Sequence, residues 1–278
     1  MKFAEENKYI NIASDIIHNG SRHVDRTGVG TRALFGKMME FDLTNGKIPL
    51  PSTRKVPTRF LPIELVWFIS GSTDIKFLLD NNVNIWNSWV IPETAVYDNN
   101  PRNIVKHFEK QGVIKLDKEY EEVFNHMDTV GINSLVSMLT GKPIPENILL
   151  SGSIGEGAYG AQWRKWDDTR LINYKDDKEY KKLIGLGYKD MNDDIYPGLV
   201  SESSPELRVM NKKIDQLADA IDLIKNNPHS RRIIVSAWNA GKLDLMALPP
   251  CHTLFQFNVR EDSDSVKHLS TTLYCRKV

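Results

Sequence analysis

Two consecutive prolines stand directly before a cysteine and a run that is typical of a buried strand. Pro249 and Pro250 precede Cys251, and His252 opens the run. Because proline locks φ and offers no N–H, the two prolines form a stiff elbow in the backbone. Such an elbow holds one thiol at the mouth of a strand, as a catalytic nucleophile requires. The alternative is a buried structural cysteine, since free cysteine is among the most buried residue types. These residues alone support both interpretations equally.

Composition narrows the class of protein. With 278 residues and 41% hydrophobic content, the chain can bury a sizeable core in one large domain or two small ones. Lys and Arg number 36, as do Asp and Glu, and this zero net charge argues against a protein that coats nucleic acid. Two cysteines are too few for a disulfide scaffold, so we expect a reducing, cytoplasmic setting. Residues 1–8 lack the apolar core of a signal peptide, and no apolar run approaches the roughly 18 residues of a membrane span.

Hydrophobic periodicity predicts the main secondary-structure elements. The predicted helices cover residues 9–17, 59–71, 74–79 and 206–226, and the predicted strands cover residues 32–43, 233–238 and 268–278. The middle of the 59–71 segment is apolar on every side, so we expect that helix to be buried.

Two segments differ in character from the rest of the chain. Residues 98–150 are charged and helix-like, with turns at three glycines, and residues 167–204 are polar and rich in Lys, Asp and Tyr. We interpret both as insertions into a single domain over residues 1–278, the second alternatively as a mobile loop.

A carboxylate and two tryptophans are candidates for a site. Glu64 stands amid large apolar residues, where a buried carboxylate must be paired, hydrogen-bonded or neutral. A salt-bridged or capping role is the alternative, but we favour a general acid or base. Trp86 and Trp89 are three residues apart. They serve either as core or as a flat wall for a heteroaromatic ligand.

Arginines mark candidate anion contacts. The loop over residues 25–31 combines Arg26 with two glycines and two threonines, which suits a phosphate, although a plain surface turn explains the loop more simply. Arg231 and Arg232 are adjacent, and neighbouring guanidinium groups repel unless an anion or carboxylates neutralise them. An exposed, solvated pair is the alternative.

Taken together, these motifs resemble those of the thymidylate synthase family, in the family's order. They lie at residues 25–31, 64–68, 159–164, 230–239 and 248–252, and the resemblance covers roughly residues 8–97, 155–166 and 205–276. It implies an α+β fold with a mixed twisted sheet flanked by helices, and a homodimer formed through the sheet face.

The resemblance also implies catalytic roles. Cys251 is the expected nucleophile toward C6 of dUMP, Glu64 the carboxylate that works through water, and Tyr159 the residue that helps to remove the C5 proton. His252, next to the thiol, is grouped with these catalytic residues. The expected co-substrate is 5,10-methylenetetrahydrofolate, and its expected contacts are Arg54, Trp86 and Trp89.

Four arginines are the expected ligands of the dUMP phosphate. The resemblance assigns Arg26 and Arg276 to one subunit, and Arg231 and Arg232 to the partner subunit's site. The expected partners are therefore dUMP, a reduced folate and a second copy of the chain. No metal is expected, because adjacent Cys251 and His252 lack the usual ligand spacing.

The chain also departs from the family's pattern. Where the family reads Tyr-Gln-Arg-Ser, this chain reads Tyr274-Cys275-Arg276-Lys277, and the family continues well beyond that point. We therefore expect this chain to be incomplete relative to a working enzyme. Two alternatives stay open: a dUMP or dCMP hydroxymethylase, in which water rather than hydride ends the reaction, and a truncated, inactive nucleotide- or RNA-binding relative. The residues that separate uracil from cytosine fall in the missing part.

Overall fold

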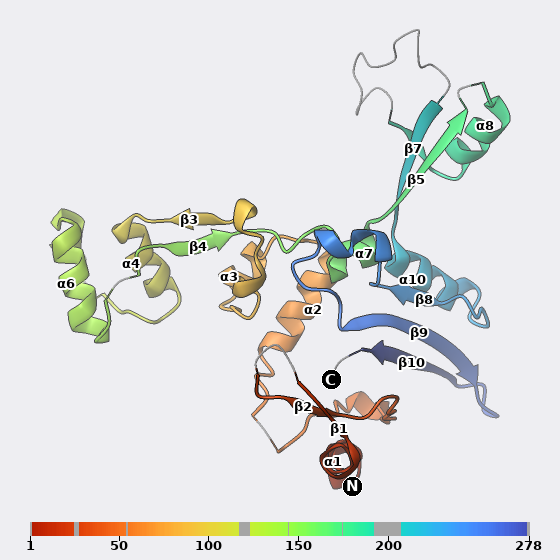
Figure 1. The fold of residues 1–278 in the computed structure, drawn as a ribbon, viewed down its shortest axis with the longest axis horizontal. Coiled ribbons are helices and arrows are strands. Elements are labelled where there is room, and N and C mark those ends of the chain that lie inside the picture. Colours follow the sequence, from red (N-terminus) through yellow and green to blue (C-terminus); the bar gives the residue numbers. More distant parts are fainter. Residues whose placement is uncertain are drawn as a thin grey trace. The chain divides into compact units, whose positions relative to one another are not determined.

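The computed structural model describes residues 2–24, 28–53, 55–116, 123–143, 145–173, 175–191 and 207–276. Within them the chain forms helices and small antiparallel sheets (Figure 1). It divides into two compact units, Met1–Leu61 and Pro62–Val278. The single domain expected over residues 1–278 stays a prediction, and each unit is described by itself.

The first unit begins with the predicted amphipathic helix. Helix α1 covers Lys2–Asn19, and the N–H of Gly20 donates to the carbonyl of Ile16 at 2.9 Å as the helix ends. Strands β1 (Ser21–His23) and β2 (Thr31–Ala33) pair antiparallel, and a 3-10 turn follows at Thr44–Gly46.

The strand predicted over residues 32–43 is wrong beyond its first two residues. Strand β2 ends at Ala33. Gly36 adopts φ 76°, and this left-handed backbone interrupts an extended run. Most of the segment that we predicted as a strand is therefore irregular.

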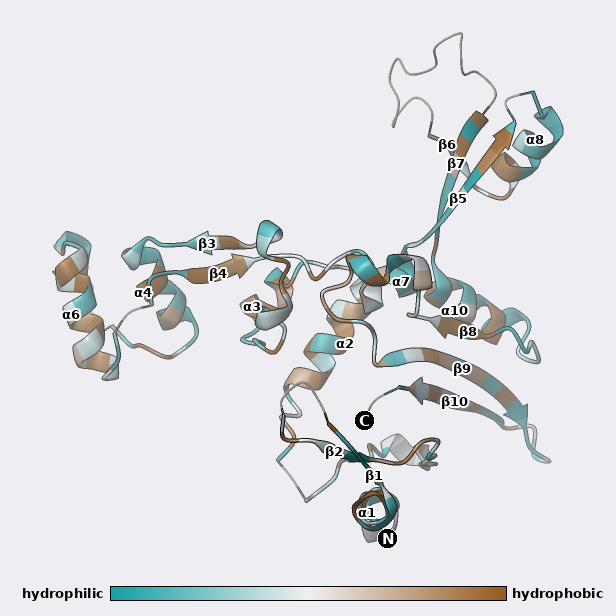
Figure 2. Cartoon of the chain, viewed as in Figure 1, coloured by the Kyte–Doolittle hydropathy of each residue, from teal (hydrophilic) through white to brown (hydrophobic). Residues whose placement is uncertain are grey.

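The described residues of the second unit form three antiparallel sheets. In the first sheet, β3 (Val96–Asp98) pairs with β4 (Ile148–Ser151). In the second, the strand order is β5 (Trp166–Asn173), β7 (Leu207–Ile214) and β6 (Lys189–Asp190). In the third, the strand order is β10 (Lys267–Cys275), β9 (His252–Glu261) and β8 (Ile234–Ser236). Hydrophobic and hydrophilic residues alternate along β9 from Phe255 to Arg260 (Figure 2). The α+β class is confirmed, but the described strands form separate antiparallel sheets rather than one mixed sheet. Dimerisation through a sheet face stays a prediction.

Helices and 3-10 turns connect these sheets. The helices are α2 (Phe60–Ser70), α3 (Lys76–Asp80), α4 (Pro101–Lys110), α6 (Thr129–Thr140), α7 (Tyr159–Arg164), α8 (Asp177–Gly185) and α10 (Gln216–Asn226), and the 3-10 turns are Asn87–Trp89, Pro92–Thr94 and Ala240–Leu245. Among the described residues, no helix has both the length and the apolar character that crossing a membrane requires.

The long helix predicted over residues 206–226 is wrong in its first half. Strand β7 occupies Leu207–Ile214, and α10 begins only at Gln216. The carboxylate of Asp215 accepts from the N–H of Ala218 at 3.0 Å, which is a helix N-cap. The apolar residues before that cap have a spacing that also fits a strand, and pairing with β5 decides between the two.

The predicted burial of α2 is correct for one face of the helix and wrong for the other. Trp67 and Phe68 are buried, whereas Leu61, Leu65 and Val66 are 44 to 53% exposed. Trp67 and Phe68 pack on the ring of Trp86, with centroid distances of 5.5 and 5.9 Å. The segment is apolar all round, but only one face of it is covered in this single chain.

Each segment that we interpreted as an insertion has a small core of its own. The core of the first consists of Val105, Ile114, Phe124, Ile132, Leu135 and Val136, and the core of the second consists of Ile172, Leu183, Tyr188 and Met210. Met210 comes from β7, so the second core extends beyond residue 204. That these segments are insertions stays a prediction.

A close approach between α7 and α2 yields a prediction about stability. A Cβ at Gly160 would lie 2.3 Å from the carbonyl oxygen of Phe68, and backbone atoms cannot rotate away. We expect Gly160→Ala to lower the free energy of unfolding by about 3 kcal/mol, at the upper end of overpacking costs. In α8, Gly185 has no other atom within 4 Å of an added Cβ, so Gly185→Ala should be neutral or stabilise by about 0.5 kcal/mol. Urea unfolding of both variants checks this, and equal effects would contradict it.

Candidate active site

The proline elbow places Cys251 directly before β9. Cys251 is half-buried, and β9 begins at His252, so the predicted strand after the thiol is confirmed, but its predicted burial is wrong, because Thr253 is the one buried residue of β9. The carbonyl of Cys251 accepts from the N–H of Arg276 at 3.0 Å. The side chain of Arg276 donates from Nε to the carbonyl of Pro250 at 2.9 Å and from Nη2 to that of Pro249 at 2.8 Å. Three hydrogen bonds from one residue after β10 therefore hold the elbow.

Tyr159 fixes the backbone of the cysteine from another side. It is the first residue of α7 and is 4% exposed. Its hydroxyl oxygen accepts from the N–H of Cys251 at 2.6 Å. Burial raises the pKa of Tyr159 to about 12, so its hydroxyl stays neutral at physiological pH. A neutral phenol therefore contacts the backbone of the residue that carries the thiol.

Aromatic rings surround this phenol. The ring of Tyr159 lies 4.8 Å from Phe68, 6.1 Å from Trp86 and 5.9 Å from His252, measured between centroids. Phe68 and Trp86 contact each other edge to face at 5.9 Å. Edge-to-face and tilted pairs are the favourable arrangements for such rings. The cluster therefore provides a rigid support on which α2, α7 and the elbow meet.

Glu64 is hydrogen-bonded from within that cluster. The indole Nε1 of Trp86 donates to Oε1 of Glu64 at 2.6 Å. Glu64 is half-buried, whereas Trp86 is only 6% exposed. The sequence-based expectation of a hydrogen-bonded carboxylate agrees with this geometry. The indole orients one carboxylate oxygen and leaves the other for a further partner.

The two tryptophans differ in exposure. Trp89 is half-buried and lies in the 3-10 turn Asn87–Trp89, where its N–H donates to the carbonyl of Trp86 at 2.9 Å. Trp86 packs between Trp67, Phe68 and Tyr159. Trp89 is therefore the better candidate for a wall beside a ligand, and Trp86 holds Glu64.

The predicted site residues fall into three groups. A chain of contacts connects Glu64, Trp86, Trp89, Tyr159, His252, Cys251 and Arg276. Arg231 and Arg232 are exposed in the turn before β8, and within the described ranges no carboxylate pairs with either. Arg26 and Arg54 lie outside the residues that the structure describes.

The structure also shows buried polar residues to which sequence reasoning gave no role. Gln162 is 1% exposed, donates to the carbonyl of Glu156 at 2.8 Å and accepts from Nδ2 of Asn239 at 2.8 Å. Gln216 donates to the carbonyls of Gln162 and Ser236 at 2.7 and 2.9 Å. These amides connect α7, α10 and β8 behind the cluster. The one signal in the sequence was a lone polar residue in the apolar run around Gln162.

The high pKa of Tyr159 predicts a stability change at alkaline pH. The unfolded phenol ionises from its ordinary pKa of 10.0, while the folded one resists up to about 12. The contribution to stability is therefore complete below pH 10 and disappears as pH rises from 10 to 12. Burial also raises the pKa of Tyr188, so the difference between wild type and Tyr159→Phe isolates Tyr159. Denaturant unfolding across this range should show a shallower pH slope for the variant, and equal slopes would exclude the effect.

The chemistry that this arrangement offers is nucleophilic addition with proton transfer. A thiol stands on a fixed backbone, and a neutral phenol and a carboxylate lie in the aromatic shell that supports it. In the described part of the chain, no group of three or more His, Cys, Asp or Glu side chains is arranged to hold a metal ion.

Comparisons with known proteins cover all of these residues. The sequence model for thymidylate synthase matches residues 7–278. Proteins named thymidylate synthase from Listeria monocytogenes serotype 4b (strain F2365) and serotype 4a (strain HCC23) are each 32% identical over 272 residues. The protein of that name from serovar 1/2a (strain ATCC BAA-679 / EGD-e) is 32% identical over 271 residues. Each comparison spans 97% of this chain and 68% of the relative.

Proposed function

Because the chain belongs to the thymidylate synthase family, we propose that it catalyses the reductive methylation of dUMP to dTMP, with 5,10-methylenetetrahydrofolate as carbon donor and reductant. The observation that best supports this proposal is the hydrogen bond from the N–H of Cys251 to the hydroxyl of Tyr159. It joins the candidate nucleophile to the aromatic cluster that holds Glu64.

In the proposed reaction, the Cys251 thiolate adds to C6 of the uracil ring. The electrons of the C5–C6 double bond move toward C5, which then attacks the one-carbon unit of the folate. Loss of the C5 proton and departure of the folate nitrogen leave a methylene group on C5, and hydride from the folate reduces it as Cys251 leaves. Glu64, held by Trp86, transfers protons through water, and Tyr159 lies beside the elbow to assist at C5.

Exposed arginines are the proposed ligands of the substrate's phosphate. Arg231 and Arg232 are exposed and carry no carboxylate partner in the described ranges, so a phosphate can neutralise both. We assign them to the dUMP phosphate, with Arg26 and with one remaining nitrogen of Arg276. In this proposal Arg231 and Arg232 serve a partner subunit, which makes the enzyme a homodimer. Trp89 lies beside the folate, and Arg54 near its glutamate tail.

The test is the identity of the product. The full chain is incubated with dUMP and 5,10-methylenetetrahydrofolate, and the nucleotide and folate are analysed by mass spectrometry. Methylated nucleotide with dihydrofolate supports the proposal. Hydroxymethylated nucleotide with tetrahydrofolate identifies a hydroxymethylase instead. Unchanged dUMP in folded protein contradicts both reactions and favours a nucleotide-binding relative.

A further inference from the structure

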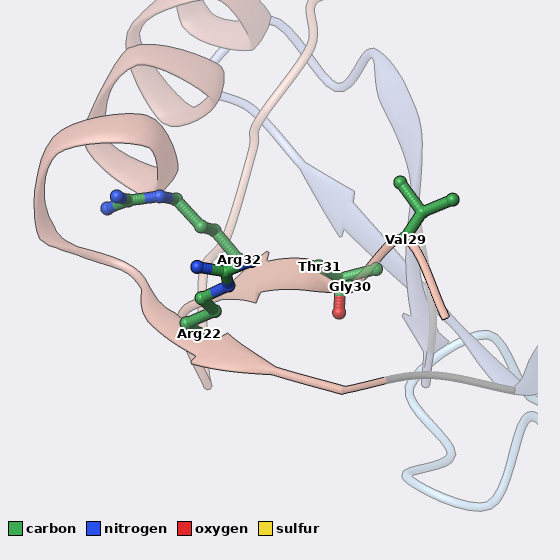
Figure 3. Close-up of a pocket in the computed structure, with 5 residues that line it drawn as sticks. All are labelled: Arg22, Val29, Gly30, Thr31 and Arg32. Carbon is green, nitrogen blue, oxygen red and sulfur yellow. The ribbon is translucent and has the colours of Figure 1, made fainter. Parts of the chain in front are cut away.

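A pocket in the first unit lies at a loop that the proposed function already uses. Its lining consists of Arg22, Val29, Gly30, Thr31 and Arg32 (Figure 3). Three of these residues belong to the loop over residues 25–31, whose Arg26 we assign to the dUMP phosphate. In the second unit, by contrast, an ion pair between Asp167 and Lys242 has no part in the proposed reaction. Asp167 is the first residue of the segment that we interpret as the second insertion, so the pair connects that segment to the turn before the elbow.

The cation of Lys242 reaches from this turn to two neighbouring segments. Lys242 lies in the 3-10 turn Ala240–Leu245, at a kink where φ is −129° and ψ is 16°. Its side chain is 18% exposed, and its Nζ donates to Oδ2 of Asp167 in β5 at 2.8 Å. The same Nζ lies 3.7 Å from Oε2 of Glu156, in the loop before Tyr159. Lys242 therefore connects the segment that leads to Cys251 with the segments on both sides of α7.

Asp167 anchors this connection, because β7 also holds its carboxylate. Oδ1 of Asp167 lies 2.6 Å from Nζ of Lys213 and accepts from Nδ2 of Asn211 at 3.1 Å, and both partners belong to β7. Burial opposes ionisation of the carboxylate, but hydrogen bonds from Lys213, Lys242 and Asn211 outweigh it and hold the pKa of Asp167 well below its ordinary value. The carboxylate is therefore charged at physiological pH, and the ion pair with Lys242 persists.

The turn packs directly against the loop before Tyr159. A Cβ at Gly157 would lie 2.7 Å from the carbonyl oxygen of Lys242, so backbone approaches backbone at this point. After the turn, the N–H of Ala247 donates to the carbonyl of Ile154 at 3.1 Å. Because closely packed segments transmit displacements, a shift of the turn would move the elbow relative to Tyr159.

We propose that Asp167 and Lys242 are positioning residues, whose ion pair fixes the turn that carries the Cys251 elbow beside Tyr159. The inference rests on the proposed function, because it concerns the nucleophile of that reaction. Within the described residues, the two side chains form hydrogen bonds and ion pairs with neither Cys251 nor Tyr159, so the pair acts through the backbone of the turn. Misplacement of a reacting group by about 1 Å costs up to about 10²-fold in rate, so an ion pair at a distance has a measurable effect.

The experiment follows alkylation of Cys251 by iodoacetamide in the full chain, without substrate, by intact mass. Every protein carries Cys275→Ala, which leaves Cys251 as the one thiol, because the chain has two cysteines. Asp167→Asn removes the charge at nearly constant size, and Lys242→Met removes the cation but keeps the apolar stem. We expect both variants to raise the rate of alkylation at least about threefold, because a loosened elbow exposes the half-buried thiol more often.

The same variants are assayed for reaction and for binding. We expect the single-turnover rate with dUMP and 5,10-methylenetetrahydrofolate to fall about tenfold or more, and the affinity for dUMP to stay within about twofold of that of wild type. A rate that falls while binding persists distinguishes positioning of the thiol from a general loss of structure.

Lys213→Met is the matched control. It removes the other lysine of Asp167, which lies in β7 rather than in the turn before the elbow. We therefore expect a lower urea midpoint, but alkylation and turnover within about twofold of wild type. Lys242→Arg keeps the cation and should behave as wild type does. If Asp167→Asn fails to fold, Lys242→Met and Lys242→Arg decide the question.

The outcomes separate this inference from the proposed function. Unchanged alkylation in Lys242→Met and Asp167→Asn would overturn the inference, as would an equal change in Lys213→Met or in Lys242→Arg. Alkylation needs no substrate, so it tests the placement of Cys251 even if the wild-type chain shows no turnover. Absence of turnover in wild type contradicts the proposed function alone.

Discussion

Replacement of Cys251 by alanine is expected to lower turnover of dUMP by at least about 10⁴-fold, because removal of the proposed covalent nucleophile would abolish the step that activates C5. The fold should persist, because the variant keeps the backbone hydrogen bonds of this residue, although it loses the hydrogen bond between its side chain and Tyr159. The N–H of Cys251 donates to Tyr159, and its carbonyl accepts from Arg276. Alanine keeps both groups. Single-turnover assays give the rate, and titration with dUMP should show that binding survives.

The second cysteine supplies the matched control. Cys275 lies at the end of β10, paired in register with His252, and is half-buried like Cys251. Cys275→Ala removes a thiol of similar burial close to the elbow, and we expect turnover to change only a few-fold. Turnover that survives in Cys251→Ala, or that is lost equally in both variants, would refute the assignment of the nucleophile.

Local signals in the sequence were sufficient for the elbow and its surroundings. Pro249 and Pro250 restrict the backbone whatever surrounds them, so the elbow before β9 could be predicted from residue type alone. Glu64 in an apolar helix was expected to be paired, hydrogen-bonded or neutral, and the structure provides a hydrogen bond from Trp86. Both predictions depend on a residue and its immediate neighbours.

Pairings between distant segments could not be predicted in this way. The spacing of apolar residues before Asp215 fits a helix and a strand alike, and only the presence of β5 selects β7. The family resemblance assigns Arg276 to a phosphate, which stays a prediction, but nothing in the sequence indicated that its guanidinium also donates to the carbonyls of Pro249 and Pro250. Long-range partners of this kind are set by tertiary packing, which a single sequence does not display.

Replacement of Glu64 by glutamine should separate catalysis from folding. The amide oxygen of glutamine can still accept from the indole of Trp86, so we expect the free energy of unfolding to change by less than about 1 kcal/mol. The amide cannot exchange protons as a carboxylate does, and the loss of a general acid or base costs about 10² to 10⁴-fold in rate. Rates in a single turnover and urea unfolding of the same sample measure the two effects.

Replacement of Trp86 by phenylalanine is the complementary variant, because it keeps the carboxylate and removes its donor. The half-buried carboxylate of Glu64 then no longer accepts a hydrogen bond from the indole, and losing a hydrogen bond of this kind costs about 1.5 to 3 kcal/mol of stability. Since the carboxylate is still present but less well oriented, the rate should fall by less than in Glu64→Gln. If Glu64 acts in proton transfer, Glu64→Gln should therefore have the larger effect on rate, and Trp86→Phe the larger effect on stability. If Glu64→Gln unfolds the protein, or leaves the rate unchanged, the carboxylate serves the fold alone, and the proton relay must be assigned to another group.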